Sequence, residues 1–424
     1  MRIFGTEKHT NPWIEKGLIP LGRTTGEKKT IVSKRMTMMT DSFFCWARPG
    51  VGKTVILKNF YYHLWLSGRP LIIFDPTGLD HRLSFLPNKF AQNLPPGTKA
   101  GGIYEHPFDK TKKVAYLNVG KSMFNWEKKY KPDLNTLERA ELLSLRFSDG
   151  AQDELRKILK TYGPFDTYDD LIDFVNKFPV NPMTAEAYRK KNVNGKSYMI
   201  TRHHKFFKEG AYINQQSKLN LLRILYKLSD EKTIGLDDTY DFDILNWVKE
   251  GNSVVFSFDR NYDLTRAVVS IVAKKILRWK SVAGYGIQPW FIFEEMDKVF
   301  PEFPKEYEKE IVDYLSELIL QLRKLSLGIG GASASPRTTN KTVIENAHNV
   351  IVGKLTGRNL IQMRYFYNQW TADKIKNLHW NRHSNLGSGQ REVLYIDEFN
   401  NKFVIEPFES PCDIHREIRG RNPK

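Results

Sequence analysis

The sequence predicts an α/β protein built on a central, mostly parallel sheet. Short apolar runs of three to five residues recur along the chain, which is typical of strands that are buried on both faces of such a sheet. Segments with apolar residues at spacings of three and four lie between several of them, as in the crossover helices of an α/β fold. The runs are 42–46, 71–74, 253–256, 290–293, 329–333 and 350–352.

Three helices are predicted beside these strands. The first, 54–67, follows a turn rich in Gly and Pro and ends near Gly68. The other two cover 264–280 and 310–325, each with a stripe of apolar side chains. Two further strands, 393–396 and 403–405, are predicted near the C-terminus. Residues 42–74 therefore form a strand–loop–helix–strand unit.

Residues 120–245 have a different texture, with Lys, Glu, Leu and Asp at helical spacing and few β-branched runs. We therefore predict three regions. Residues 1–120 supply N-terminal strands and the first part of the core, 121–245 form a mostly α-helical insertion, and 246–424 complete the core.

Composition excludes several classes of protein. The 424 residues are 41% hydrophobic, enough for a sizeable core, and the net charge of +17 favours a polyanionic partner, either nucleic acid or an anionic membrane surface. Two distant cysteines, Cys45 and Cys412, cannot build a disulfide framework or a Cys-type zinc site. No run of about 18 apolar residues and no signal-peptide core are present, so we expect a cytoplasmic protein without membrane insertion.

Residues 47–54, Ala-Arg-Pro-Gly-Val-Gly-Lys-Thr, match a phosphate-binding loop in its relaxed form. Small residues let backbone N–H groups surround a β-phosphate, Lys53 neutralises phosphate oxygens, and the Thr54 hydroxyl is a ligand for Mg²⁺. The helix that follows directs its N-terminus at the anion. Ala47 replaces the usual first glycine, which is tolerable if that position needs no positive φ. The predicted ATP-binding residues are Arg48, Pro49, Gly50, Val51, Gly52, Lys53, Thr54 and Val55.

Such a match also occurs by chance in Gly-rich turns, but the strand before it and the helix and strand after it favour the phosphate site. Its expected partner is Glu294-Glu295, which directly follows the apolar run 290–293. Glu294 is predicted to hold Mg²⁺ together with Thr54, and Glu295 to orient or deprotonate the attacking water. The alternative is a solvated acidic cluster at a strand end.

Taken in order, these motifs resemble the HerA–FtsK superfamily of P-loop ATPases, which pump DNA or assist its transfer. The similarity covers roughly residues 20–120 and 245–408. Besides the phosphate loop and Glu294-Glu295, it rests on Gly22-Arg23, Asp-Pro-Thr-Gly-Leu-Asp at 75–80, Leu322-Arg323-Lys324, Ala-Ser-Ala-Ser-Pro at 332–336, and a closing β-hairpin at 398–407.

The resemblance implies a P-loop NTPase core of the RecA/HerA-like kind, with ATP and Mg²⁺ bound at the subunit interfaces of a hexameric ring. Arg323 is then the first candidate to reach the γ-phosphate of a neighbouring subunit, with Arg337 and Arg358 as alternatives. Two departures stand out. Glu294 occupies the place of the usual Asp, and Ala334 that of the sensor Gln, so Ser333 or Ser335 would provide the polar contact.

Two basic clusters with interleaved aromatic residues are candidates for contacts to nucleic acid. The first lies in 186–209 within the insertion, and the second in 354–376. The alternative for each is a solvated helix face whose aromatic residues belong to the core. The second cluster comprises Lys354, Arg358, Arg364, Tyr365, Tyr367, Trp370, Lys374 and Lys376.

The leading functional hypothesis is an ATP-hydrolysing motor that moves double-stranded DNA through a ring without reading its sequence. The resemblance places it on the viral or plasmid side of the superfamily, in genome packaging or conjugation, which would mean the host cytoplasm for a viral protein. The alternatives are an ATP-binding switch or assembly scaffold with little hydrolysis and a plasmid conjugation or replication ATPase. An AAA+ helicase loader is disfavoured because strands, rather than a helical lid, end the chain.

Overall fold

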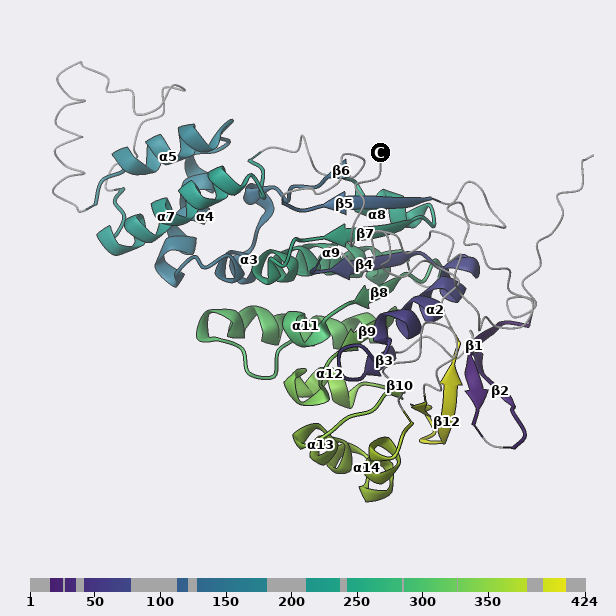
Figure 1. Ribbon diagram of the computed structural model, residues 1–424. Coiled ribbons are helices and arrows are strands. Elements are labelled where there is room, and N and C mark those ends of the chain that lie inside the picture. The colour runs from purple at the N-terminus through teal and green to yellow at the C-terminus, as the bar shows by residue number, and fades with distance from the viewer. Residues whose placement is uncertain are drawn as a thin grey trace, which may run out of the picture.

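The computed structural model describes residues 16–25, 27–35, 42–77, 113–120, 128–180, 211–236, 242–283, 286–325, 327–379 and 392–408. Within these residues, twelve strands form one sheet in the order β2-β1-β12-β11-β10-β3-β9-β8-β4-β7-β5-β6 (Figure 1). The strands are β1 Leu18–Thr24, β2 Ile31–Arg35, β3 Ser42–Trp46, β4 Leu71–Asp75, β5 Val114–Asn118, β6 Lys128–Lys129, β7 Ser253–Ser257, β8 Trp290–Phe293, β9 Gly328–Ser333, β10 Asn349–Val352, β11 Val393–Ile396 and β12 Lys402–Pro407.

From β10 to β6 every neighbouring pair in the sheet is parallel. The predicted α/β class with a mostly parallel sheet is therefore confirmed. Strand β9 lies between β3 and β8, with Cys45 opposite Ala332 on one side and Phe293 opposite Gly331 on the other. Because the carboxyl ends of parallel strands meet at one edge, the loops that follow β3, β8 and β9 gather there.

The other part of the sheet is antiparallel and joins both ends of the described chain. The two strands predicted from the apolar runs at 393–396 and 403–405 form the hairpin β11–β12, which starts earlier than the hairpin expected at 398–407 and pairs through β12 with β1. Gly22 is required at this contact, because a Cβ atom there would lie 2.3 Å from the carbonyl oxygen of Glu406. The Gly22-Arg23 motif thus belongs to a strand contact at one end of the sheet, away from the carboxyl ends of β3 and β8.

Helices cover both faces of the parallel strands, as buried strands require. One apolar cluster packs α2 against alternate strand residues such as Phe43, Ile73 and Ile292, and a larger one packs α9 and α11 against the opposite set, including Phe44 and Phe74. The helices are α2 Lys53–Leu66, α3 Arg139–Ser144, α4 Asp149–Tyr162, α5 Tyr168–Lys177, α7 Gln215–Glu231, α8 Ile244–Lys249, α9 Tyr262–Ala283, α10 Met296–Val299, α11 Glu306–Lys324, α12 Lys341–Glu345, α13 Arg358–Phe366 and α14 Gln369–Lys376.

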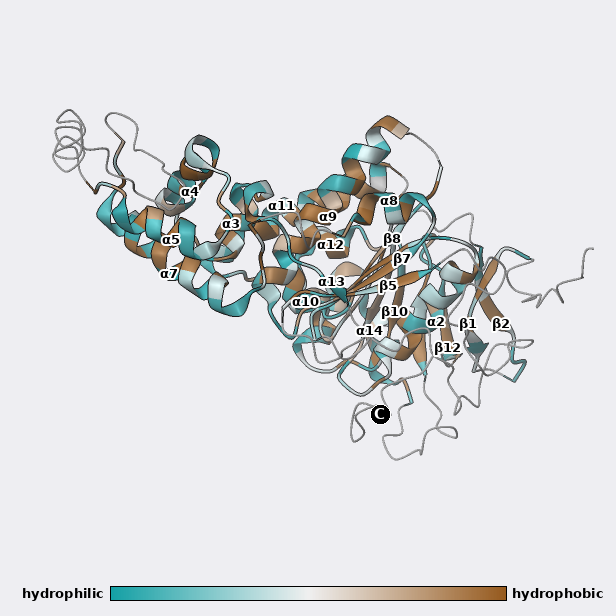
Figure 2. Ribbon diagram, turned by 90° about the horizontal axis from the view of Figure 1, so that it is seen from above, coloured by the Kyte–Doolittle hydropathy of each residue, from teal (hydrophilic) through white to brown (hydrophobic). Residues whose placement is uncertain are grey.

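The region between β6 and α8 contains α3, α4, α5 and α7, which matches the predicted helical texture. In Figure 2, α4, α5 and α7 lie to one side of the sheet, while α3 packs on α9 and α11. The Ser144 hydroxyl at the end of α3 is 3.3 Å from the Asp263 carbonyl oxygen in the first turn of α9. The helical region therefore meets the core beside the carboxyl end of β7. The boundaries at 121 and 245 stay a prediction.

Most predicted helices and strands are present, with changes at their ends. The helix predicted over 310–325 begins at Glu306, because the acidic Glu306 and Glu308 suit a first helical turn. Strand β5 and helices α13 and α14 were not predicted. Strand β5 is short and half-exposed on alternate residues, and only Met363 in α13 is buried, so neither has a strong apolar pattern.

Candidate active site

The loop between β3 and α2 has the backbone of a phosphate-binding loop. Gly50 and Gly52 have φ angles of +83° and +90°, which L-residues with a Cβ rarely adopt. Ala47 does not have a positive φ, so the condition for replacing the usual glycine there is met. Behind the loop, a Cβ atom on Gly353 would lie 2.6 Å from the Cβ of Ala47 and 2.7 Å from Val51 Cγ1. The loop therefore depends on Gly353, which follows the neighbouring strand β10, as well as on its own glycines.

The N-terminus of α2 is free to bind an anion. Its first turn has no side-chain cap, so its N–H groups remain available, together with the positive end of the helix dipole. The Lys53 ammonium lies 3.4 Å from the Arg48 carbonyl oxygen and therefore stays over the loop. Pro49 and Gly50 are exposed at its tip. The arrangement presents backbone donors and one cation to a phosphate chain.

A side chain from each of two separated segments meets at this edge of the sheet. The Thr54 hydroxyl donates a 2.5 Å hydrogen bond to Glu294 Oε1, across the position of β9. Glu294 is only 3% exposed, so its carboxylate lies within the site and not in a solvated acidic cluster. A hydroxyl and a carboxylate are hard oxygen ligands of the kind that Mg²⁺ takes while it keeps several waters. The pair fits the predicted metal-binding role of Thr54 and Glu294.

Beneath the loop, Cys45 on β3 is fully buried. Burial raises the pKa of the Cys45 thiol to about 12, with the nearby charges of Lys53 and Glu294 acting in opposite directions on it. The thiol therefore stays protonated and packs as a small core residue. Among the described residues, no group of three or more His, Cys, Asp or Glu side chains could hold a metal ion.

Glu295, the predicted activator of water, faces a different neighbour from Glu294. Its backbone is left-handed, with φ and ψ both 50°, and it precedes the short helix α10. The Tyr262 hydroxyl, at the start of α9, donates a 2.7 Å hydrogen bond to Glu295 Oε2. Tyr262 was not predicted from the sequence, since nothing in the run around it marks it as a partner of an acid 33 residues later.

Ser333, at the end of β9 and next to the predicted sensor position Ala334, belongs to a hydrogen-bonded cluster. Ser333 Oγ lies 3.0 Å from Asp297 Oδ1 and 3.0 Å from Thr339 Oγ1. Ser335 Oγ bonds Asn359 Oδ1 at 2.5 Å, which connects this loop to α13. Sequence reasoning did not single out Asp297, Thr339 or Asn359, whose partners lie 6 to 36 residues away. A catalytic role for Ser333 stays a prediction.

The candidate arginines lie on three different elements. Arg323 is in the last turn of α11, and its side chain lies outside the described residues. Arg337, in the 3₁₀-helix Pro336–Thr338, and Arg358, the first residue of α13, are exposed and follow β9 and β10 at the carboxyl edge. All three remain predictions for a residue that acts on a neighbouring subunit.

The two basic clusters differ in what can be said of them. The cluster at 186–209 lies outside the described residues. In the second cluster, Tyr365 and Trp370 are 71% and 49% exposed, so the alternative that its aromatic residues belong to the core is wrong for these two. The ammonium groups of Lys374 and Lys402 lie 5.4 and 5.6 Å from the Trp370 ring centroid. Within the described residues, no helix is long and apolar enough to cross a membrane.

Comparisons with known proteins give a likeness of structure and none of sequence. No protein-family model matches the chain, and no curated protein matches it. The bacterial conjugative coupling protein TrwBdeltaN70 is 13% identical with a TM-score of 0.53, over 96% of this chain and 92% of that one. VirB4 of Thermoanaerobacter pseudethanolicus is 12% identical with a TM-score of 0.53, over 92% and 96%. The plasmid coupling protein TrwB in complex with ADP and Mg²⁺ is 14% identical with a TM-score of 0.52, over 94% and 95%.

These neighbours match almost the full length of this chain. At such low identity the likeness concerns the fold, and it agrees with the parallel sheet, the loop after β3 and the acids after β8. The chain therefore shares the mixed α/β fold of TrwB and VirB4, which agrees with the fold class that its motifs predicted.

Proposed function

We propose that the protein hydrolyses ATP with Mg²⁺ and uses this reaction to move double-stranded DNA through an oligomeric ring. The observation that carries the proposal is the 2.5 Å hydrogen bond between Thr54 and Glu294, which lie 240 residues apart. This hydrogen bond brings the phosphate loop beside the acid that follows β8, and Glu295 is the residue after that acid. Phosphoryl transfer needs little beyond this positioning and charge stabilisation.

Each residue has a defined task in this mechanism. Backbone N–H groups of residues 50–54 bind the β-phosphate, and Lys53 exchanges its contact with the Arg48 carbonyl for phosphate oxygens. Thr54 and Glu294 would hold Mg²⁺, which neutralises charge on the β- and γ-phosphates when bound. The oxygen of the attacking water bonds the γ-phosphorus, and Glu295 accepts the proton that the water loses. The bond between the γ-phosphorus and the oxygen that bridges it to the β-phosphate breaks, and ADP leaves.

The proposed mechanism also needs an arginine, which a neighbouring subunit of the ring would supply. Charge that spreads over the transferring phosphoryl group is stabilised by a planar guanidinium, which a neighbouring subunit can supply. Arg323 remains our first candidate on the resemblance. Arg337 and Arg358 are supported by their exposure at the carboxyl edge. Loss of turnover with retained ATP binding in one of the three single Ala variants would identify the residue.

DNA is the polyanion that we propose for the net charge of +17. Non-specific binding of this kind is electrostatic and weakens steeply with salt. The exposed basic residues of α13 and α14 and the cluster at 186–209 are candidate contacts. The TrwB structures named above are those of a conjugative or plasmid coupling protein, whereas our sequence-based proposal includes packaging.

ATP turnover measured with and without double-stranded DNA tests the proposal. We expect DNA to stimulate turnover, Lys53→Ala to weaken ATP binding, and Glu295→Gln to abolish turnover while ATP still binds. The exposed Glu306→Gln, at the start of α11 and outside the site, is the matched control for loss of one carboxylate. Absence of DNA stimulation together with unchanged turnover in Glu295→Gln would refute the motor.

The second candidate is an ATP-dependent switch or assembly scaffold that hydrolyses ATP very slowly. The observation that favours it is the Ser333 hydroxyl, a candidate with Ser335 to replace the sensor glutamine, which already forms hydrogen bonds with Asp297 and Thr339. Analytical ultracentrifugation with ATP, alongside a turnover assay, separates the two. Tight binding, assembly on ATP and negligible turnover favour the scaffold, whereas rapid turnover excludes it.

A further inference from the structure

Glu295 is held by a residue from a different part of the chain. Tyr262 follows the end of β7, two strands away from β8 in the sheet order, on the side opposite the phosphate loop. Its hydroxyl donates to Oε2 of Glu295. Burial, and then the contact with Glu295, raises the pKa of the Tyr262 phenol, so it stays protonated and donates at neutral pH. Glu295 Oε1 is left to receive a proton.

The segment before Tyr262 has an unusual backbone. Asp259 and Arg260 both have positive φ, 47° and 62°, and Glu295 on the facing loop does too. Such conformations are strained in residues with a Cβ, and they persist where surrounding contacts require them. One contact is the Arg260 N–H, which donates to the Pro76 carbonyl oxygen at 2.5 Å. The backbone is thus bent so that Tyr262 reaches Glu295.

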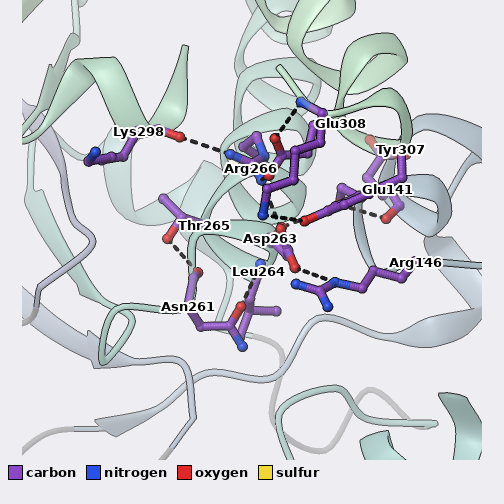
Figure 3. A network of polar contacts seen from close by, with 12 residues as sticks. Glu141, Arg146, Asn261, Asp263, Leu264, Thr265, Arg266, Lys298, Tyr307 and Glu308 are labelled. Atoms are coloured by element: carbon purple, nitrogen blue, oxygen red, sulfur yellow. Dashed lines mark hydrogen bonds and ion pairs between the residues drawn. The ribbon is translucent and has the colours of Figure 1, made fainter. Parts of the chain in front are cut away.

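A buried arginine joins the helices next to the two partners of this hydrogen bond, and Figure 3 shows its contacts with Asp263, Glu308 and Lys298. Arg266, one turn after Tyr262 and only 2% exposed, pairs with Asp263 at 2.8 Å and with Glu308 at 2.7 Å. Its other terminal nitrogen donates to the Lys298 carbonyl oxygen at 2.8 Å. Lys298 is in the short helix that directly follows Glu295. The same guanidinium therefore joins the helix that carries Tyr262 to the helix that follows Glu295.

The helical insertion contacts the same turn of α9. Arg146, in the connection after α3, donates to Asp263 Oδ2 at 2.9 Å, as Figure 3 shows. Asp263 is the residue next to Tyr262, and Ser144 contacts its carbonyl oxygen. A displacement of the insertion would therefore act on the residue beside Tyr262.

We infer that Tyr262 is a positioning residue for Glu295 and that the Arg146–Asp263 ion pair ties it to the helical insertion. The Tyr262 hydroxyl holds one carboxylate oxygen so that the other points at the attacking water. A contact made by the insertion reaches the water-activating group through the first turn of α9. This inference rests on the proposed ATP hydrolysis and adds to it the residue that orients its base.

Tyr262→Phe removes only the hydroxyl and is the first test. A hydrogen bond to a charged group contributes about 1.5–3 kcal/mol, so we expect kcat for ATP to fall at least about 10-fold. KM should stay within about two-fold, because the contact does not involve ATP binding. Tyr168→Phe is the matched control, since it removes another half-buried hydroxyl, bonded to the Ile234 carbonyl oxygen within the insertion. It should leave kcat unchanged.

A double-mutant cycle tests the connection to the insertion. Arg146→Gln alone should lower kcat. Adding it to Tyr262→Phe should lower kcat no further, because both substitutions act through the orientation of the Glu295 carboxylate. Independent, multiplying effects would overturn the connection, and an unchanged or raised kcat in Tyr262→Phe would overturn the positioning role. Glu295→Gln separates the two levels: if it retains full turnover, the proposed hydrolysis itself fails, whatever Tyr262→Phe does.

Discussion

The two adjacent acids at the end of β8 belong to two differently built regions. Glu294 faces the phosphate loop, whose positive φ angles are taken by Gly50 and Gly52 and whose helix has no side-chain cap. Glu295 faces the start of α9, where positive φ angles are taken by Asp259 and Arg260.

The difference lies in how each region satisfies its polar groups. The phosphate loop leaves N–H groups and Lys53 available to a ligand. Around Tyr262, the carboxylates and the guanidinium already pair with each other, as Arg266 does with Asp263 and Glu308. An anion-binding loop must keep donors for its ligand, whereas a residue that orients a base must be fixed beforehand. In the mechanism that we propose, one side of β8 receives the substrate, and the other side holds the base in place.

The largest expected effect separates the two acids. Glu295→Gln should lower kcat about 10²- to 10⁴-fold, the typical contribution of a general base, with little change in the Mg²⁺ concentration that gives half-maximal turnover. Glu294→Gln should instead raise that Mg²⁺ concentration about 10- to 100-fold. Mg²⁺ titrations of ATP turnover measure both. Identical responses in the two variants would contradict the division of roles.

Arg266→Ala tests the side of β8 that faces α9. It leaves Asp263 and Glu308 without their buried partner, so we expect about 3–5 kcal/mol less free energy of unfolding in urea. Arg139→Ala is the control, because Arg139 pairs with Asp149 and Glu310 while its side chain is 48% exposed. Removing such an exposed pair should change the free energy of unfolding by less than about 1 kcal/mol. Equal losses in both variants would show that the buried network has no special weight.

His63 lies on α2, the helix that follows the phosphate loop, and it should make the free energy of unfolding depend on pH. Burial lowers the pKa of His63 from 6.5 to about 4, and its Nδ1 lies 2.8 Å from the Asn59 carbonyl oxygen. Between pH 6.5 and 4 the His63 imidazole is protonated in the unfolded chain but stays neutral in the folded chain. Its contribution to the free energy of unfolding is therefore fully present above pH 6.5 and is lost as the pH falls towards 4. The loss should approach about 3 kcal/mol. Urea unfolding of His63→Gln between pH 4 and 7 should show a correspondingly flatter dependence, and a parallel curve would contradict this assignment.

The smallest effect concerns the glycines. Gly50→Ala should weaken ATP binding about 5- to 30-fold, because a left-handed residue with a Cβ costs about 1–2 kcal/mol and no neighbour lies within 4 Å of the new methyl group. Gly17→Ala introduces the same strain at φ +61°, also in open space, but on the N-terminal side of β1. It should leave ATP affinity unchanged when binding is measured by calorimetry. Equal losses of affinity would mean that the Gly50 effect is one of general stability.

The phosphate loop and the acids were predictable because their chemistry is local. A strand, a glycine turn and a helix start are written within residues 42–66, and the acids follow directly on an apolar run. Helices α13 and α14 were not predictable in this way, since much of their surface is exposed and the apolar stripe that marks a core helix is weak.

The sequence by itself determined the fold class and the positions of the candidate phosphate loop and of the two adjacent acids, because apolar periodicity and loop glycines act over a few neighbouring residues. The tertiary structure decided which groups meet. Sheet order places β9 between β3 and β8 so that Thr54 reaches Glu294, and it brings Tyr262 from the end of β7 to Glu295. Such contacts depend on how strands align across the sheet, and no local pattern of residues encodes them.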